Sequence, residues 1–160
     1  MSEVLLQQIE KLAAEQQAKC AQLRKGETMI EIDQTQVKNF VKGLVTETLA
    51  RHLSTITGLD LGQNIGIIYH FWHERNTIHV RTTVPKEKPT ALSIVDIVPG
   101  SILYEMEIHD MFGVEFTGNP WMDRKLLLPD TWPRDLPPPL LKTVKPADIR
   151  KRLGLEVERK

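Results

Sequence analysis

The 160-residue chain has a single cysteine, Cys20, and no excess of charge of either sign. One cysteine excludes an internal disulfide and a metal cluster held by this chain's thiolates alone. Twenty-one basic residues balance twenty-one acidic ones, so bulk charge gives no reason to expect binding to nucleic acid or to an anionic membrane surface. The sequence also lacks a glycine-rich phosphate loop and a nucleophile elbow. These absences argue against several common classes of enzyme.

Long apolar runs are absent as well. No stretch approaches the roughly 20 apolar residues that a membrane-spanning helix requires. The first residues lack the basic start and the apolar core of a signal peptide, so we expect the protein to be made and kept in the cytosol. A hydrophobic fraction of 41% is ordinary for a globular protein, and the length suits one domain with a real core.

Two helices and a strand are expected in the first third of the chain. Apolar residues recur at three- and four-residue steps from Val4 to about Leu23, which predicts a helix that stops near Gly26. Residues 28–32 have the composition of a strand, and Asp33 has the features of a helix N-cap. The inward face of the second helix is expected to hold Val37, Val41, Leu44, Val45 and Thr48.

A β-hairpin is the clearest expectation in the middle of the chain. Apolar and polar residues alternate in residues 65–73 and again in residues 77–84. A two-residue turn at Glu74-Arg75 would place Phe71 opposite Ile78, although Glu-Arg is not a favoured pair for such a turn. Before the hairpin, residues 53–57 are expected to form a short strand that closes at Gly58.

Proline dominates the end of the chain, where seven of the ten prolines fall between positions 120 and 146. Such a tail cannot form a helix or a central strand. We expect an extended arm that ends in a short helix started by Pro146. The sequence thus predicts an N-terminal helix (1–26), an α+β domain (27–118) and the arm with its short helix (119–160). The expected fold class is α+β, with a mixed or antiparallel sheet of roughly four strands and helices packed on one side.

The segment 104–128 sets ionisable groups into a run that is otherwise apolar. If residues 101–112 form a helix, apolar side chains cover nearly every direction around it, which predicts a buried helix. A buried carboxylate without a partner costs several kcal/mol, so the acidic groups must find cations or hydrogen-bond donors. The ionisable residues of the helix are Glu105, Glu107, His109 and Asp110, and the nearby cations are Arg75, Arg81, Arg124 and Lys125.

Three interpretations of this helix remain open on its pattern alone. Glu107 with Asp110, or Glu105 with His109, could form a general acid/base pair. The spacing of Glu105 and His109 offers two ligands of a metal site that needs three or four. In the third interpretation the helix is structural and lies between its own sheet and a neighbour. The pattern favours the structural helix, because ion pairs also form without doing chemistry.

Two histidines of the hairpin give a further candidate site. In the expected register His70 faces His79 on the sheet side that also carries Trp72 and Arg81. Two cross-strand histidines bind zinc when a third ligand approaches, and the sequence nearby offers no obvious cysteine or aspartate. A freestanding metalloprotein or enzyme that uses these histidines, or Glu105 with His109, is therefore the alternative hypothesis.

Several motifs between about residues 53 and 135 carry a family resemblance. They are YEME at 104–107, DMFG at 110–113, FTGNP at 116–120 followed by Arg124, SIVDI at 93–97 and LPDTWP at 128–133. Together they resemble the 30 kDa subunit family of respiratory complex I, the respiratory NADH dehydrogenase. That family includes the corresponding subunit of energy-converting membrane-bound hydrogenases and similar archaeal complexes. The LPDTWP run and the short tail resemble the hydrogenase-like or sulfane-reducing branch.

The sequence departs from the family pattern at two positions. Met106 stands where the family has arginine, and Asn119 stands where it usually has histidine. The first change removes a cation from beside Glu105 and Glu107. We therefore expect these acids to pair differently, across an interface with another subunit.

The resemblance implies a subunit that binds no cofactor and no metal and has no catalytic residue of its own. Such a subunit is a structural and assembly component of the peripheral arm of a membrane-bound oxidoreductase complex, on the cytoplasmic side. Its implied partners are the large subunit, of nickel–iron or quinone-site type, and neighbouring iron–sulfur subunits; the complex couples electron transfer to ion transport. The residues implied to bind the partner are Glu105, Glu107, Asp110, Phe112, Gly113, Phe116, Gly118, Pro120 and Arg124.

Overall fold

A computed structural model describes residues 3–133 and 135–155 of the chain. Helices and strands alternate irregularly, as expected for an α+β protein. In chain order the elements are α1 (Glu3–Glu15), β1 (Lys19–Arg24), β2 (Glu27–Glu31), α2 (Gln34–Glu47), β3 (His52–Asp60), β4 (Asn64–His73), β5 (Asn76–Pro85), β6 (Thr90–Leu92), α3 (Ser101–Phe112), β7 (Glu115–Thr117) and α4 (Pro146–Arg152).

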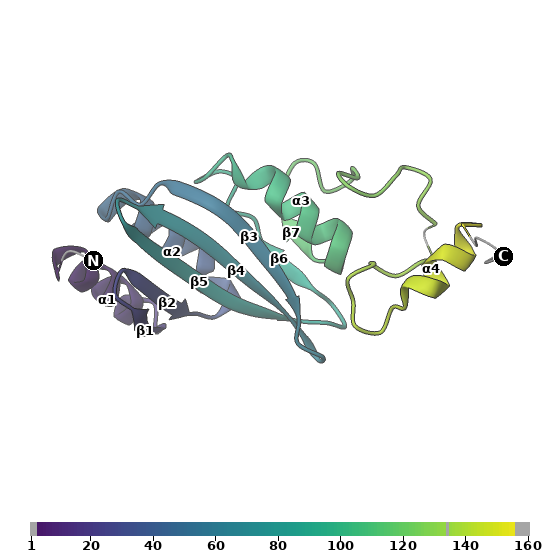
Figure 1. Cartoon of the computed structure of the whole chain (residues 1–160). Coiled ribbons are helices and arrows are strands. Elements are labelled where there is room, and N and C mark those ends of the chain that lie inside the picture. Colours follow the sequence, from purple (N-terminus) through teal and green to yellow (C-terminus); the bar gives the residue numbers. More distant parts are fainter. Residues whose placement is uncertain (1–2, 134, 156–160) are drawn as a thin grey trace.

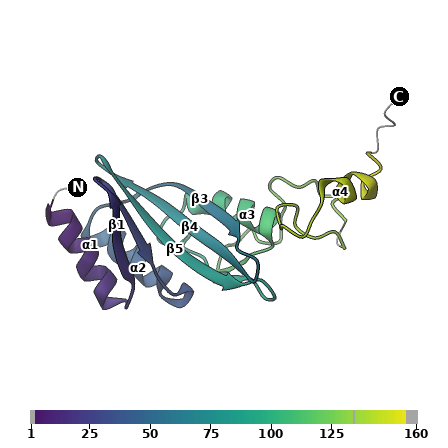
Figure 2. The ribbon, with the colours of Figure 1, turned by 60° about the horizontal axis from the view of Figure 1, so that its bottom comes forward.

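The main sheet has five strands in the order β1-β2-β5-β4-β3, and all neighbours are antiparallel except the pair β2 and β5. Helices α1, α2 and α3 lie on one face of this sheet, while no helix among the described residues covers its other face (Figures 1 and 2). Their apolar side chains form one core with the inward residues of the strands. The predicted α+β class, with helices on one side of a mixed sheet, is confirmed.

The hairpin of β4 and β5 has the register that the alternation predicts. Phe71 pairs with Ile78 and Tyr69 with Val80, which places the apolar set on the inward face. The turn is made by Glu74 and its neighbour, and Glu74 takes a left-handed backbone with φ of 54°. The N-cap prediction is also confirmed, because the Asp33 carboxylate accepts the backbone N–H of Thr35 at 2.9 Å at the start of α2.

The predicted N-terminal helix is wrong in its second half. Helix α1 ends at Glu15, where Gln17 takes a left-handed conformation and the Ala18 N–H returns to the Ala13 carbonyl at 2.8 Å. The chain then forms β1, the edge strand of the sheet. Because β1 is largely exposed, its pairing with β2 and not an apolar pattern decides its structure. Gly26 is accordingly the turn between β1 and β2 and not a helix stop.

Strand β3 extends past Gly58, where it was expected to close. A side chain at Gly58 would meet the Phe112 ring, since an ideal Cβ lies 2.5 Å from one of its carbons. The glycine therefore lets α3 pack directly against the sheet. Beyond the small parallel pair β6–β7 the chain continues as the proline-rich arm, and α4 begins at Pro146 as predicted (Figure 1). The division into segments 1–26, 27–118 and 119–160 stays a prediction.

Candidate functional site around helix α3

Helix α3 carries its ionisable residues on different sides. Glu105 and Asp110 are buried, whereas Glu107 faces solvent. The helix ends where Gly113 takes a left-handed backbone with φ of 78° and its N–H bonds to the His109 carbonyl. This end turns the chain into β7 and places the following loop, residues 118–128, back along the helix.

Glu105 is fully buried and is held by four donors that carry no charge. Its Oε1 accepts the Ile94 backbone N–H at 3.0 Å and the Ser101 hydroxyl at 3.1 Å. Its Oε2 accepts the Ser93 hydroxyl at 2.7 Å and the Asn119 side-chain N–H at 3.0 Å. Burial raises the pKa of Glu105, and these hydrogen bonds oppose that rise. The carboxylate thus ties the loop before α3 to the loop after it.

This arrangement corrects the expectation for Glu105. It was predicted to pair with a cation across an interface, because Met106 removes the neighbouring arginine. Instead, Met106 is itself buried, and the second unusual residue, Asn119, binds Glu105 within the chain. The Asn119 amide cannot reverse freely, since its oxygen accepts the Trp121 N–H and its nitrogen also donates to the Ile102 carbonyl.

Asp110 holds the loop that follows β7. Its Oδ2 accepts three consecutive backbone N–H groups, from Leu126 and Leu127 at 2.8 Å and from Leu128 at 3.1 Å. Its Oδ1 lies 3.8 Å from the Lys125 ammonium and has no hydrogen-bond partner in the described part of the chain. Hydrogen bonds to an ionised acceptor are about twice as strong as neutral ones, so this short stretch of loop is firmly positioned.

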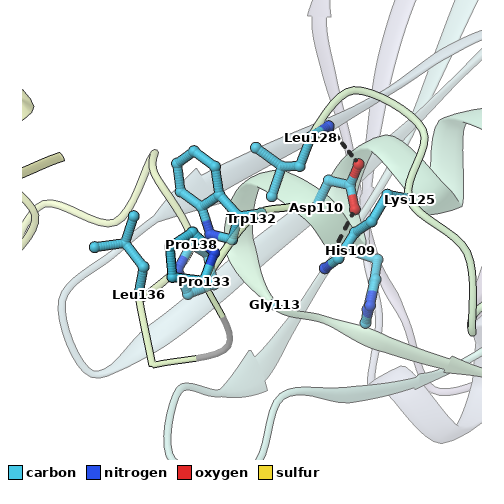
Figure 3. A pocket seen from close by; sticks show the side chains of 9 residues that line it. All are labelled: His109, Asp110, Gly113, Lys125, Leu128, Trp132, Pro133, Leu136 and Pro138. Atoms are coloured by element: carbon cyan, nitrogen blue, oxygen red, sulfur yellow. Dashed lines mark hydrogen bonds and ion pairs between the residues drawn. The ribbon is translucent and has the colours of Figure 1, made fainter. Parts of the chain in front are cut away.

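A pocket of about 230 Å³ lies between the end of α3 and the arm. Figure 3 shows its apolar wall on one side and its ionisable residues on the other, where the Asp110 carboxylate stands between the loop and Lys125. The lining residues are His109, Asp110, Gly113, Lys125, Leu128, Trp132, Pro133, Leu136 and Pro138.

Large apolar side chains are exposed on the loop that Asp110 holds. Leu127 is 57% exposed, and Leu126 and Trp121 of the same loop are also exposed. The Arg124 guanidinium stacks 5.5 Å from the centre of the Trp121 ring. An exposed apolar group on a fixed backbone is a common feature of protein interfaces, because little entropy is lost when it binds.

A second anchor, at Asp60, was not anticipated from the sequence. This carboxylate, at the end of β3, bonds Lys86 at 2.6 Å, the Gly62 N–H at 2.8 Å and the Lys142 backbone N–H at 2.8 Å. These bonds, led by that to Lys86, lower its pKa to about 2. Asp60 therefore fixes the arm to the sheet. Its partner Lys142 is 82 residues away in the chain, a separation at which local patterns carry no signal.

The alternative acid/base and metal pairs are not assembled in the described residues, and of Glu107 and Asp110 the first is exposed while the second is buried. His109 bonds the Val114 carbonyl at 2.9 Å, whereas Glu105 has the four partners described above. His70 and His79 do face each other, but their Nδ1 atoms contact one another at 2.7 Å and do not converge on a common point. In residues 3–133 and 135–155 no group of three potential ligands could hold a metal ion.

The nine predicted partner-binding residues fall into two groups. Glu105, Asp110, Phe112 and Phe116 are buried in the chain itself, with Gly113 half-buried at the end of α3. The residues Glu107, Gly118, Pro120 and Arg124 are exposed. The first group makes contacts within the chain, and the second group has side chains or backbone at the surface.

A family model agrees with this architecture. The model described as respiratory-chain NADH dehydrogenase, 30 Kd subunit, matches residues 30–149. The NADH-quinone oxidoreductase subunit designated C of Jannaschia sp. is 33% identical over 112 residues, which cover 66% of this chain and 53% of that protein. The corresponding subunit of Roseiflexus castenholzii is 34% identical over 85 residues, which cover 50% of this chain and 48% of that protein. The chain thus spans about half the length of these relatives.

Solved structures share the fold. A chain of the membrane-bound sulfane sulfur reductase, an archaeal respiratory membrane complex, superposes with a TM-score of 0.83 at 24% identity. That match covers 99% of this chain and 94% of the other. A trypsin-resistant fragment of Nqo5 superposes with a TM-score of 0.62 at 20% identity, over 72% of this chain and 98% of the fragment.

Proposed function

Since the chain belongs to the family of the 30 kDa subunit of respiratory-chain NADH dehydrogenase, we propose that it is a non-catalytic structural subunit of a membrane-bound, complex I-like oxidoreductase. Its place is the peripheral arm of that complex, on the cytoplasmic side, against the large subunit and beside the iron–sulfur subunits. Within the described residues no helix has the length and apolar character to cross a membrane.

One observation carries the proposal: apolar side chains are exposed on a loop whose backbone is firmly held. We use the term docking surface for the outward side of α3 together with this loop, residues 118–128. Asn119 fixes the loop to the start of the helix, and Asp110 fixes it near the end. The exposed residues of the docking surface are Leu103, Glu107, Trp121, Arg124, Leu126 and Leu127.

The buried acids have a structural role in this proposal. Glu105 and Asp110 use most of their hydrogen-bonding capacity on the two loops around α3, so neither is poised for proton transfer to a substrate. The docking surface is mixed in character, with apolar leucines and a tryptophan flanked by Glu107 and Arg124. Such a composition, aromatic and arginine together, is enriched where proteins meet.

Among possible complexes, the proposal favours the hydrogenase-like or sulfane-reducing branch. The superposition on the sulfane sulfur reductase chain includes almost the whole of this chain, and so the arm as well. The match to the Nqo5 fragment covers less of it. In this proposal the large subunit is of the nickel–iron type or its sulfane-reducing counterpart, and the complex couples electron transfer to ion transport.

The test replaces one leucine of the docking surface and a matched leucine far from it. Leu127 is 57% exposed, and Leu23, on the edge strand β1, is 54% exposed. Tagged wild-type chain, Leu127→Glu and Leu23→Glu are purified from the native host, and the copurifying proteins are quantified by mass spectrometry. We expect the wild type and Leu23→Glu to recover a large oxidoreductase subunit with iron–sulfur subunits. Leu127→Glu should reduce that recovery about tenfold or more, as expected for a well-packed interface residue.

Two results would contradict the proposal. In the first, the wild-type chain copurifies with no oxidoreductase subunit. In the second, the isolated chain contains stoichiometric iron, nickel or zinc by elemental analysis, which would favour the freestanding metalloprotein. Equal recovery by both leucine variants would leave the complex in place but would refute the docking surface.

A further inference from the structure

The face of the sheet opposite the helices carries a polar chain that crosses four strands. Thr57 Oγ1 on β3 contacts His70 Nε2 on β4 at 2.9 Å. His70 Nδ1 contacts His79 Nδ1 on β5 at 2.7 Å, and His79 Nε2 contacts Glu27 Oε1 on β2 at 3.0 Å. We call these four residues the polar chain. It arises from the strand order, because the parallel pairing of β2 with β5 sets Glu27 beside the histidine pair.

Hydrogen counting restricts what the two histidines can bind. Every ring nitrogen of the pair already has one partner, and a neutral imidazole has one donor and one acceptor nitrogen. Between the two Nδ1 atoms, a separation of 2.7 Å has room for one hydrogen and not for two. The pair can therefore hold at most three ring hydrogens, which corresponds to a single positive charge.

Glu27 selects the arrangement of the neutral pair. The His79 and Arg24 hydrogen bonds lower the pKa of Glu27, so its carboxylate accepts and cannot donate. His79 must then donate from Nε2 and accept at Nδ1, which makes His70 the donor between the rings. His70 Nε2 is left as an acceptor for the Thr57 hydroxyl. All the hydrogen bonds thus point in one direction, from Thr57 to Glu27.

From this geometry we infer that the polar chain is a binding site for one proton, which enters at His70 and leaves its charge on His79. The incoming proton binds His70 Nε2, and the hydrogen between the rings passes from His70 Nδ1 to His79 Nδ1. The Thr57 hydroxyl turns from donor to acceptor. Within the polar chain only N–H bonds form and break, and the incoming proton comes from solvent. The positive charge then lies against the Glu27 carboxylate.

The surrounding charges agree with this direction of transfer. Burial, and then the neighbouring His79, lower the pKa of His70, which disfavours a positive charge on the His70 ring. On the same face β1 contributes Arg24, which binds the other oxygen of Glu27. Two residues beyond His79 on β5, Arg81 is paired with Glu31 of β2 at 3.2 Å. Thr57, the member of the polar chain on β3, contributes a hydroxyl and no charge. The inference does not depend on the proposed function.

A proton count tests the inference directly. Nitrogen-15 NMR of the full chain follows the histidine rings from about pH 8 to about pH 5, the range in which histidine titrates. We expect His70 and His79 to change together at one midpoint, with one proton taken up between them. At high pH the spectra should show His70 protonated at Nδ1 and His79 protonated at Nε2. Two separate midpoints, two protons, or the reverse tautomers would each overturn the inference.

Two substitutions test the number of bound protons and the role of Glu27. Replacing His70 with asparagine leaves His79 to bind one proton, so the number should stay at one; a fall from two to one would mean independent histidines. Replacing Glu27 with glutamine removes the carboxylate beside the charge, and the midpoint should move down by about one pH unit. An unmoved midpoint would contradict the role of Glu27. The exposed His52 provides the internal reference, and tautomer assignment in the wild type needs no variant.

Discussion

Replacing the buried Glu105 with glutamine should destabilise the fold although the two side chains have almost the same shape. Each carboxylate oxygen accepts one hydroxyl, from Ser93 or Ser101, and one N–H, from Ile94 or Asn119. A hydroxyl can turn and accept, but an N–H cannot. Whichever way the glutamine amide is turned, its NH2 group meets one of the two fixed N–H donors.

The magnitude follows from the bonds that are lost. One hydrogen bond to a charged acceptor, about 1.5–3 kcal/mol, disappears, and one buried donor is left unsatisfied at a cost of about 1–3 kcal/mol. Removing the charge offsets part of this loss, because burial disfavours the ionised form and raises the pKa of Glu105. We expect the free energy of unfolding to fall by about 2–4 kcal/mol. The melting temperature of a chain of this length should then drop by about 5–15 °C.

Urea unfolding followed by circular dichroism, together with scanning calorimetry, measures both quantities. The matched control is Glu107→Gln, two positions further along the same helix, where the side chain is exposed. That substitution should change the free energy of unfolding by less than about 0.5 kcal/mol. If Glu105→Gln is as stable as the Glu107 control, the four donors do not hold a carboxylate, and our account of α3 is wrong.

Three further predictions concern packing, pH and the docking loop. Gly58→Ala should lower the free energy of unfolding by about 1–3 kcal/mol, because the new Cβ would overlap the Phe112 ring. Calorimetry measures this loss. The control Gly100→Ala, where a Cβ meets nothing within 4 Å, should show no such loss. The folded pKa of Asp60, about 2, lies below its ordinary value of 3.8, so its contribution to stability is present above about pH 4 and is lost as the pH falls towards 2. Urea titrations should show this loss in the wild type and a weaker pH dependence in Asp60→Asn. Asp110→Ala frees three backbone N–H groups, so their amide hydrogen exchange should accelerate at least tenfold, whereas Asp123→Ala should leave it unchanged.

Periodic patterns predicted the elements whose structure depends on a buried face. The register of β4 and β5 followed from alternation, because a slip of one residue would turn Phe71 and Ile78 to the solvent. Helix α2 followed from its cap at Asp33 and its apolar stripe. The edge strand β1 is exposed along most of its length, with only Cys20 partly buried, and its apolar residues repeat at helical spacing. Its structure is set by pairing with β2, which no local pattern encodes.

The same reasoning predicted only part of the candidate site. The buried helix and the burial of Glu105 and Asp110 were predicted correctly, whereas Glu107 was expected to be buried and is exposed. The family resemblance is confirmed by the match to residues 30–149. The partners of the buried carboxylates were not predicted. Asp110 binds main-chain N–H groups and Glu105 binds hydroxyls and an amide, and such donors are present everywhere in a sequence. A search for cations could not identify them. The role of the nine signature residues in partner binding stays a prediction.

The bond between Asp60 and the Lys142 backbone has a consequence for the order of folding. It closes a loop of 82 residues, and its acceptor stands at the last residue of β3. Bringing such distant groups together costs chain entropy that only an already formed sheet can offset. The arm therefore settles last, after β3 has paired with β4. In a newly made chain the arm would therefore take its final position only after this part of the sheet has formed.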